Sequence, residues 1–121
     1  MTQVKIKRVY DPEERSDGFR VLVDKLWPRG IKKEDLHYDL WAKDITPSAE
    51  LRKWFHEDVE KNWEGFSALY QKELSSSDAV KAFVANIKDK TVVTLLYASK
   101  DAVHNHALIL KEFLEKSLAK S

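Results

Sequence analysis

The chain has no cysteine, and this absence narrows the chemistry that it can support. Disulfide bonds, thiolate nucleophiles and cysteine-ligated zinc are excluded. A chain without cysteine also suits a reducing compartment, so we expect a cytoplasmic protein. The residues after Met1 are polar and charged, and no long apolar run occurs anywhere. We therefore expect neither a signal peptide nor a membrane span.

Glycine is scarce, and neither sign of charge is in large excess. The three glycines are isolated from one another, so neither a P-loop nor a dinucleotide-binding fingerprint is present. The 21 Lys and Arg residues nearly balance the 20 Asp and Glu residues, which disfavours the strongly basic face of a nucleic-acid binder. His104 and His106 are two residues apart, and no histidine has a metal-ligand spacing, so we expect no metal and no cofactor.

The hydrophobic residues that are present, 43% of 121, suffice for one core, so residues 1–121 are expected to form a single domain. Strands are predicted near 3–9, 19–24 and 91–98, and helices near 48–57, 59–74, 78–89 and 101–118. Residues 92–98 are continuously apolar, which is typical of a central strand covered on both faces. Residues 36–41 form either a short strand or an ordered loop. The expected fold is α/β, three-layered or nearly so, with a small and mostly parallel sheet.

The connection between the first two strands is short. Asp11, Pro12 and Glu14 have the order of a helix start, and Gly18 can end the turn, so one compressed helical turn is expected there. Parallel strands usually need a longer crossover, which leaves an antiparallel pair as an alternative.

Polar side chains follow each predicted strand at its end. If the strands are parallel, these side chains meet at one edge of the sheet. Helix starts near Asp11 and at 99–101 would add free backbone N–H groups, a favourable setting for an anion. The expected ligand is a small anion, such as a nucleotide or phosphorylated metabolite, contacted by Arg8, Lys25 and Arg29. The full set of candidate ligand-binding residues is Arg8, Tyr10, Lys25, Trp27, Arg29, Lys100 and Asn105.

The same residues also have structural interpretations. Asp24 could pair with Arg8 or Arg29 to hold the turn, Trp27 could fill the core, and Asp11 and Asp101 could cap helices. Asp24 and Asp101 are in addition candidate catalytic residues, because two carboxyls in different environments can divide into an acid and a base. The sequence does not by itself name a reaction.

The remaining hypotheses involve the helices. His106 is expected to be a hydrogen-bonded core histidine. The basic and aromatic segment 51–56 is interpreted as a core face with solvated charges. A competing function is a protein-interaction or homo-oligomerising module without catalysis, whose apolar patch would be Trp54, Trp63, Phe66 and Tyr70. A nucleic-acid-associated regulator is the third hypothesis, and the near-zero net charge disfavours it.

Several motifs carry a family resemblance. They are the segments 8–11, 17–30, 51–56 and 94–101, together with Trp41, Pro47-Ser48 and Asn105-His106-Ala107. This pattern resembles the YeaO-like branch of a bacterial family, domain-of-unknown-function family 488. The resemblance implies an α/β fold with a parallel sheet and supplies no activity. The resemblance also implies that more distant members carry a Cys-His-Arg triplet where this chain has Asn105-His106-Ala107. Only the histidine, His106, is retained, so no thiol mechanism is carried over to this chain.

Overall fold

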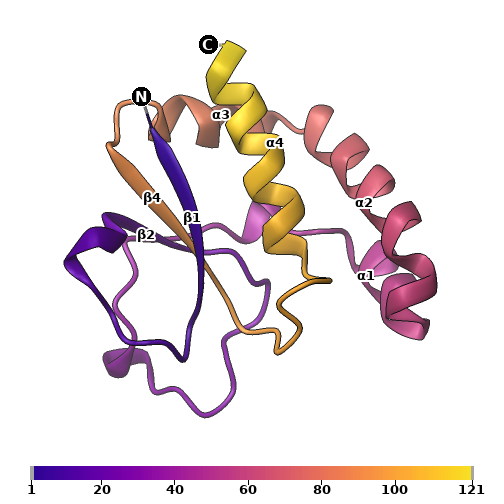
Figure 1. Cartoon of the computed structure of the whole chain (residues 1–121), viewed down its shortest axis with the longest axis horizontal. Helices are drawn as coiled ribbons and strands as arrows, with labels where there is room; N and C mark the ends of the chain where they lie inside the picture. Colours follow the sequence, from indigo (N-terminus) through magenta and orange to yellow (C-terminus); the bar gives the residue numbers. More distant parts are fainter. Residues whose placement is uncertain (1, 121) are drawn as a thin grey trace.

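The apolar run forms strand β4 (Val92–Tyr97), an interior strand of the sheet in the computed structural model, which describes residues 2–120. The sheet order is β1-β4-β2-β3, and every pairing is parallel (Figure 1). The other strands are β1 (Gln3–Arg8), β2 (Phe19–Leu22) and β3 (Leu40–Trp41). The α/β fold and the central position of this run are confirmed, and residues 40–41 are a short strand. The antiparallel alternative was wrong, because β1 and β2 both pair with β4 in parallel.

The two faces of the sheet are covered by different kinds of structure. Val21, Val23 and Leu95 lie on one face and pack with the helices in one apolar cluster. Leu22 and Leu96 lie on the other face and pack beneath the irregular segment between β2 and β3, which contains the 3-10 turn η2 (Lys33–Asp35). The alternation of side chains along each strand therefore buries both faces, as a parallel sheet requires.

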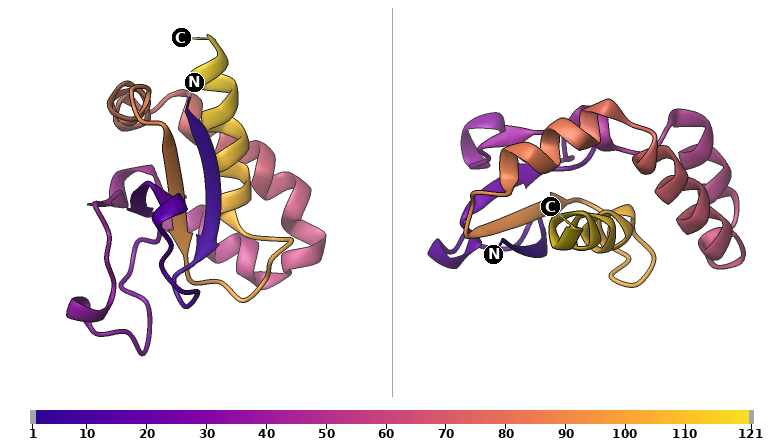
Figure 2. Two further views of the ribbon diagram at one scale, coloured as in Figure 1. Left: turned by 60° about the vertical axis from the view of Figure 1, so that its left-hand side comes forward. Right: turned by 90° about the horizontal axis from the view of Figure 1, so that it is seen from above.

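Three helices connect β3 to β4 after the 3-10 turn η3 (Lys43–Ile45). They are α1 (Ala49–Glu57), α2 (Val59–Ser75) and α3 (Asp78–Ile87). Each begins where a polar side chain accepts a hydrogen bond from the first turn, and these caps are Ser48, Asp58 and Ser77. Figure 2 shows the hairpin of α1 and α2 on the side away from the sheet. Within residues 2–120, no helix combines the length and apolar character needed to span a bilayer.

The last helix, α4 (His106–Lys120), begins later than the expected position near 101. Asp101 Oδ1 accepts hydrogen bonds from the backbone N–H groups of Val103 and His104, which holds residues 101–104 in a turn. Asn105 Oδ1 then accepts from Leu108 N at 3.1 Å, which is the geometry of an N-cap. Two residues suited to capping compete, and Asn105 is the one that caps the helix.

The helical turn expected at Asp11 also lies further along the chain, as η1 (Arg15–Asp17). Asp17, not Asp11, makes the decisive contacts: Asp17 Oδ2 accepts from Glu14 N and from the Arg20 guanidinium. Lys7 Nζ lies 2.7 Å from Asp17 Oδ1. Asp17 and Arg20 are only 1% and 2% exposed, so the turn forms where a buried charge cluster fixes it.

Replacement of Asp17 should therefore destabilise the fold strongly. Asp17→Asn leaves the buried Arg20 guanidinium without its counter-charge, and we expect the free energy of unfolding to fall by about 3–5 kcal/mol. Urea denaturation measures the change. Glu14→Gln is the matched control, because Glu14 also pairs with Lys7 but is 64% exposed, and its loss should cost under about 1 kcal/mol. Equal effects of the two substitutions would contradict the role given to Asp17.

Gly18 should also resist substitution. Its φ is +63°, and an added Cβ would collide with the backbone of Val92 in the central strand. Gly18→Ala should cost about 1–3 kcal/mol from strain, with the collision added. Gly30→Ala is the comparison, because Gly30 has φ +77° but open space around it. A thermal melt that ranks Gly30→Ala as the more harmful change would refute this account.

Candidate functional site

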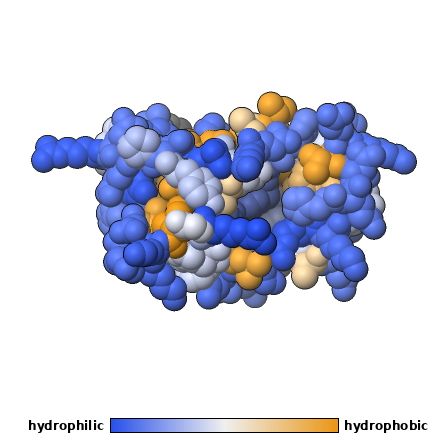
Figure 3. Space-filling view, turned by 90° about the horizontal axis from the view of Figure 1, so that it is seen from below, coloured by the Kyte–Doolittle hydropathy of each residue, from blue (hydrophilic) through white to orange (hydrophobic). Residues whose placement is uncertain are grey.

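The site lies where neighbouring parallel strands send the chain to opposite faces of the sheet. After β4 the chain leads to α4 on the helical face, and after β2 it covers the other face. A crevice opens at such a point, beyond the carboxyl ends of the strands. Here it is a pocket of about 450 Å³. Figure 3 views the molecule from this end and shows the hollow between two parts of the surface.

Most of the pocket lining comes from four segments. They are the stretch after β2, the stretch 46–56 that leads into and along α1, the stretch after β4 and the start of α4, and Tyr10 and Phe66 add to them. The polar side chains among the lining residues are Tyr10, Asp24, Lys25, Trp27, Arg29, Thr46, Arg52, His56, Ser99, His104, Asn105 and His106. Apolar side chains such as Phe55 and Phe66 form part of the wall. The pocket is thus mixed in character, with charged groups set against aromatic rings.

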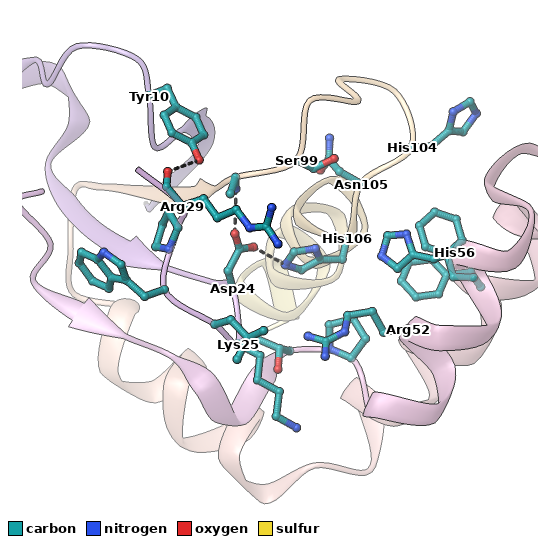
Figure 4. A pocket seen from close by; sticks show the side chains of 18 residues that line it. Tyr10, Asp24, Lys25, Arg29, Arg52, His56, Ser99, His104, Asn105 and His106 are labelled. Carbon is teal, nitrogen blue, oxygen red and sulfur yellow. Dashed lines mark hydrogen bonds and ion pairs between the residues drawn. The ribbon is translucent and has the colours of Figure 1, made fainter. Parts of the chain in front are cut away.

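Asp24 and His106 form the centre of the pocket (Figure 4). Asp24 Oδ2 accepts a hydrogen bond from Ala98 N at 2.8 Å, and its Oδ1 lies 3.3 Å from His106 Nε2. His106 Nε2 also lies 2.6 Å from the carbonyl oxygen of Val23. Asp24 therefore joins the segments after β2 and β4 to the first residue of α4. The pairings of Asp24 with Arg8 or Arg29 weighed above are not the ones present.

Burial dominates the electrostatics of this pair. It raises the pKa of Asp24, although the His106 charge and the Ala98 hydrogen bond oppose the shift. Burial lowers the pKa of His106, although the Asp24 charge opposes it. Arg52 lowers the pKa of both groups. The imidazole is therefore held toward its neutral form.

Two arginines reach into the pocket from different elements. Arg29 comes from the stretch after β2 and Arg52 from α1, and Figure 4 shows the Asp24–His106 pair between them. Lys25 extends from the rim away from that pair. Within residues 2–120, the side chains of these three cations make no hydrogen bond and no ion pair. Their charges are available to a ligand.

Tyr10, Trp27 and Asn105, all named from the sequence, line the pocket but are already engaged. The Tyr10 hydroxyl donates to the Arg29 carbonyl at 2.9 Å. Trp27 Nε1 donates to the Ile31 carbonyl at 2.6 Å. Asn105 uses both ends of its amide, donating to the Asp101 carbonyl and accepting from the α4 backbone. Asn105 is thus a helix cap at the edge of the pocket.

Arg8, Lys100 and Asp101 lie outside the residues that line the pocket. Arg8 donates to the carbonyls of Ser99 and Ala98 and lies over the Tyr10 ring. Hydrogen bonds from the backbone of His104 and Val103 lower the pKa of Asp101. The pKa of Asp101 is thus shifted in the opposite direction to the pKa of Asp24, as a division into acid and base requires. The two carboxyls do not line the same cavity, however. The backbone N–H groups that a helix start at 99–101 would leave free are also partly engaged, because those of Val103 and His104 donate to Asp101 Oδ1.

Sequence reasoning missed Arg52, His56 and His104 as pocket residues. It read Arg52 and His56 as solvated charges on a helix whose apolar side faces the core. Leu51 and Phe55 do face the core, yet Arg52 and His56 on the same helix border the pocket. The local pattern holds no signal for this, because it depends on where α1 docks. In residues 2–120, no cluster of three or more metal-ligating side chains occurs.

The fold and the pocket define a class of protein, a single α/β domain with a parallel sheet and a cationic crevice at its strand ends. The chain belongs to domain-of-unknown-function family 488: the family model described as "Inactive DUF488-N3 subclade" matches residues 3–121. The YeaO protein of Escherichia coli K12 is 50% identical over 111 residues, 92% of this chain and 96% of that protein. Rv3073c of Mycobacterium tuberculosis H37Rv is 40% identical over 113 residues, 93% of this chain and 94% of that one. Both relatives are named as uncharacterised proteins. No solved structure gave a significant match.

The electrostatic coupling of Asp24 and His106 is directly measurable. The Asp24 charge favours the protonated imidazole, so Asp24→Asn should lower the pKa of His106 further below its usual value of 6.5. An NMR titration of the histidine ring protons reads this shift. A pKa of His106 that is unchanged or raised in Asp24→Asn would contradict the pairing.

Proposed function

We propose that this pocket binds a small organic anion, such as a nucleotide or a phosphorylated metabolite, and that binding rather than turnover is its activity. The observation that carries the proposal is the balance of charge around the cavity. Lys25, Arg29 and Arg52 form no salt bridge among residues 2–120, and the lining holds a single carboxylate, Asp24, which contacts Ala98 N and His106. A cavity with surplus fixed cations attracts anions.

The dimensions and chemistry of the cavity support a small molecule. Its volume of about 450 Å³ lies within the range of roughly 300–1,000 Å³ that is usual for small-ligand pockets. Arginine guanidinium groups bind carboxylates and phosphates through paired hydrogen bonds. Arg29 and Arg52 supply such groups from two separate elements. Arg52, which lines the pocket, thus replaces Arg8, which does not, as a contact for the anion.

Binding without catalysis agrees with two further observations. The matching family model is described as an inactive subclade. The chain has no thiol at all, and Asn105 spends its amide in capping α4. The acid–base hypothesis for Asp24 and Asp101 loses its basis, since Asp101 is not among the lining residues.

The interaction-module hypothesis has less support. Of the four aromatic residues expected to form its patch, Phe66 and Tyr70 are 1% and 0% exposed and belong to the core. Trp54, at 37%, is the one of the four that counts as exposed.

Ligand screening by thermal shift tests the proposal, with AMP, glycerol 3-phosphate and inorganic phosphate as probes. A probe at a hundredfold its dissociation constant should stabilise the protein by about 2.7 kcal/mol. Arg29→Ala and Arg52→Ala should each weaken binding about tenfold or more, since a hydrogen bond to a charged group contributes about 1.5–3 kcal/mol.

Arg15→Ala is the matched control for these variants. It removes the same charge from an exposed position outside the pocket lining, and binding should change little. If no probe stabilises the protein, or if Arg15→Ala weakens binding as much as the pocket variants do, anion binding at this pocket is ruled out.

A further inference from the structure

We propose that the pocket selects anions that carry a hydroxyl or amine beside the charged group, and that His106 Nδ1 is the atom that accepts the hydrogen bond from that group. The inference rests on the proposed function, because it names the class of ligand that the same pocket takes. It follows from which nitrogen of the His106 ring holds the proton.

The fold fixes that proton on Nε2. His106 Nε2 lies 2.6 Å from the carbonyl oxygen of Val23. A carbonyl oxygen has no proton to give, so the imidazole donates through an Nε2–H. In the neutral ring the other nitrogen, Nδ1, then carries a lone pair and accepts. The lowered pKa of His106 favours this neutral form.

Nδ1 is free to meet a ligand. In the described part of the chain it makes no hydrogen bond, and the His106 side chain lines the pocket with 19% of its surface exposed. Several neighbouring polar groups are already hydrogen-bonded within the protein. Asn105 Oδ1 accepts from Leu108 N, and the hydroxyl protons of Tyr10 and Thr46 go to backbone carbonyls.

A half-buried acceptor beside fixed cations sets a requirement on the ligand. Arg29 and Arg52 satisfy the anionic group, but they cannot accept a hydrogen bond. A ligand without a donor would cover Nδ1 and leave it without water or partner, which costs binding free energy. A hydroxylated or aminated organic anion satisfies both needs, so a hydroxyl-bearing phosphate ester should bind better than its deoxy analogue.

Isothermal titration with two matched probes tests this. Glycerol 3-phosphate and propyl phosphate share a three-carbon chain and a phosphate ester, but only the first has hydroxyl groups. The natural protein should bind glycerol 3-phosphate about tenfold more tightly, at mildly alkaline pH where His106 is neutral. Equal binding of the two probes would overturn this inference and leave anion binding intact. Binding of neither probe, nor of inorganic phosphate, would overturn the proposed function instead.

Two substitutions at His106 separate its two nitrogens. His106→Gln places an amide N–H where Nε2 donates to Val23 but removes the acceptor at Nδ1, so the preference should disappear. His106→Asn places its amide oxygen near the Nδ1 position, so part of the preference should return. His37→Gln, at an exposed histidine outside the pocket lining, should keep the full preference. A preference that survives in His106→Gln, or one that is absent in His106→Asn, would show that Nδ1 is not the acceptor.

Discussion

The contacts of Asp24 with Ala98 N and His106 are the constraint on which the geometry of the site depends. Parallel strands β2 and β4 diverge beyond their carboxyl ends, because their following segments cover opposite faces of the sheet. The Asp24 carboxylate spans this divergence, with one oxygen on Ala98 N and the other beside His106. A crevice that would otherwise vary in width is thereby given fixed walls.

The same carboxylate is the one negative charge in a pocket lining that also holds Lys25, Arg29 and Arg52. It forms no salt bridge with Arg29 or Arg52, because its two oxygens face Ala98 N and the imidazole of His106. The cost of burying it is visible in its raised pKa. The positive charge of Arg52 opposes that shift from a distance. The pocket has a partly desolvated lining, where electrostatic interactions are stronger than in bulk water.

Local patterns predicted the elements but not their mutual placement. The continuous apolar run at 92–98 predicted a covered central strand, and it forms β4. By contrast, His106 meets a carbonyl 83 positions away in the chain, and no local spacing encodes such a contact. The start of α4 was missed for a related reason: both Asp101 and Asn105 can cap, and the chain uses the first for a turn.

The position of Asn105 links the site to what the family resemblance implies. Where more distant members resemble one another in carrying a thiol, this chain has an amide whose two ends are spent on the backbone at the start of α4. That substitution exchanges a reactive atom for a helix cap worth about 1 kcal/mol, and it leaves His106 in place. The difference at this position leaves the pocket intact, because its cations and its imidazole come from other positions of the chain.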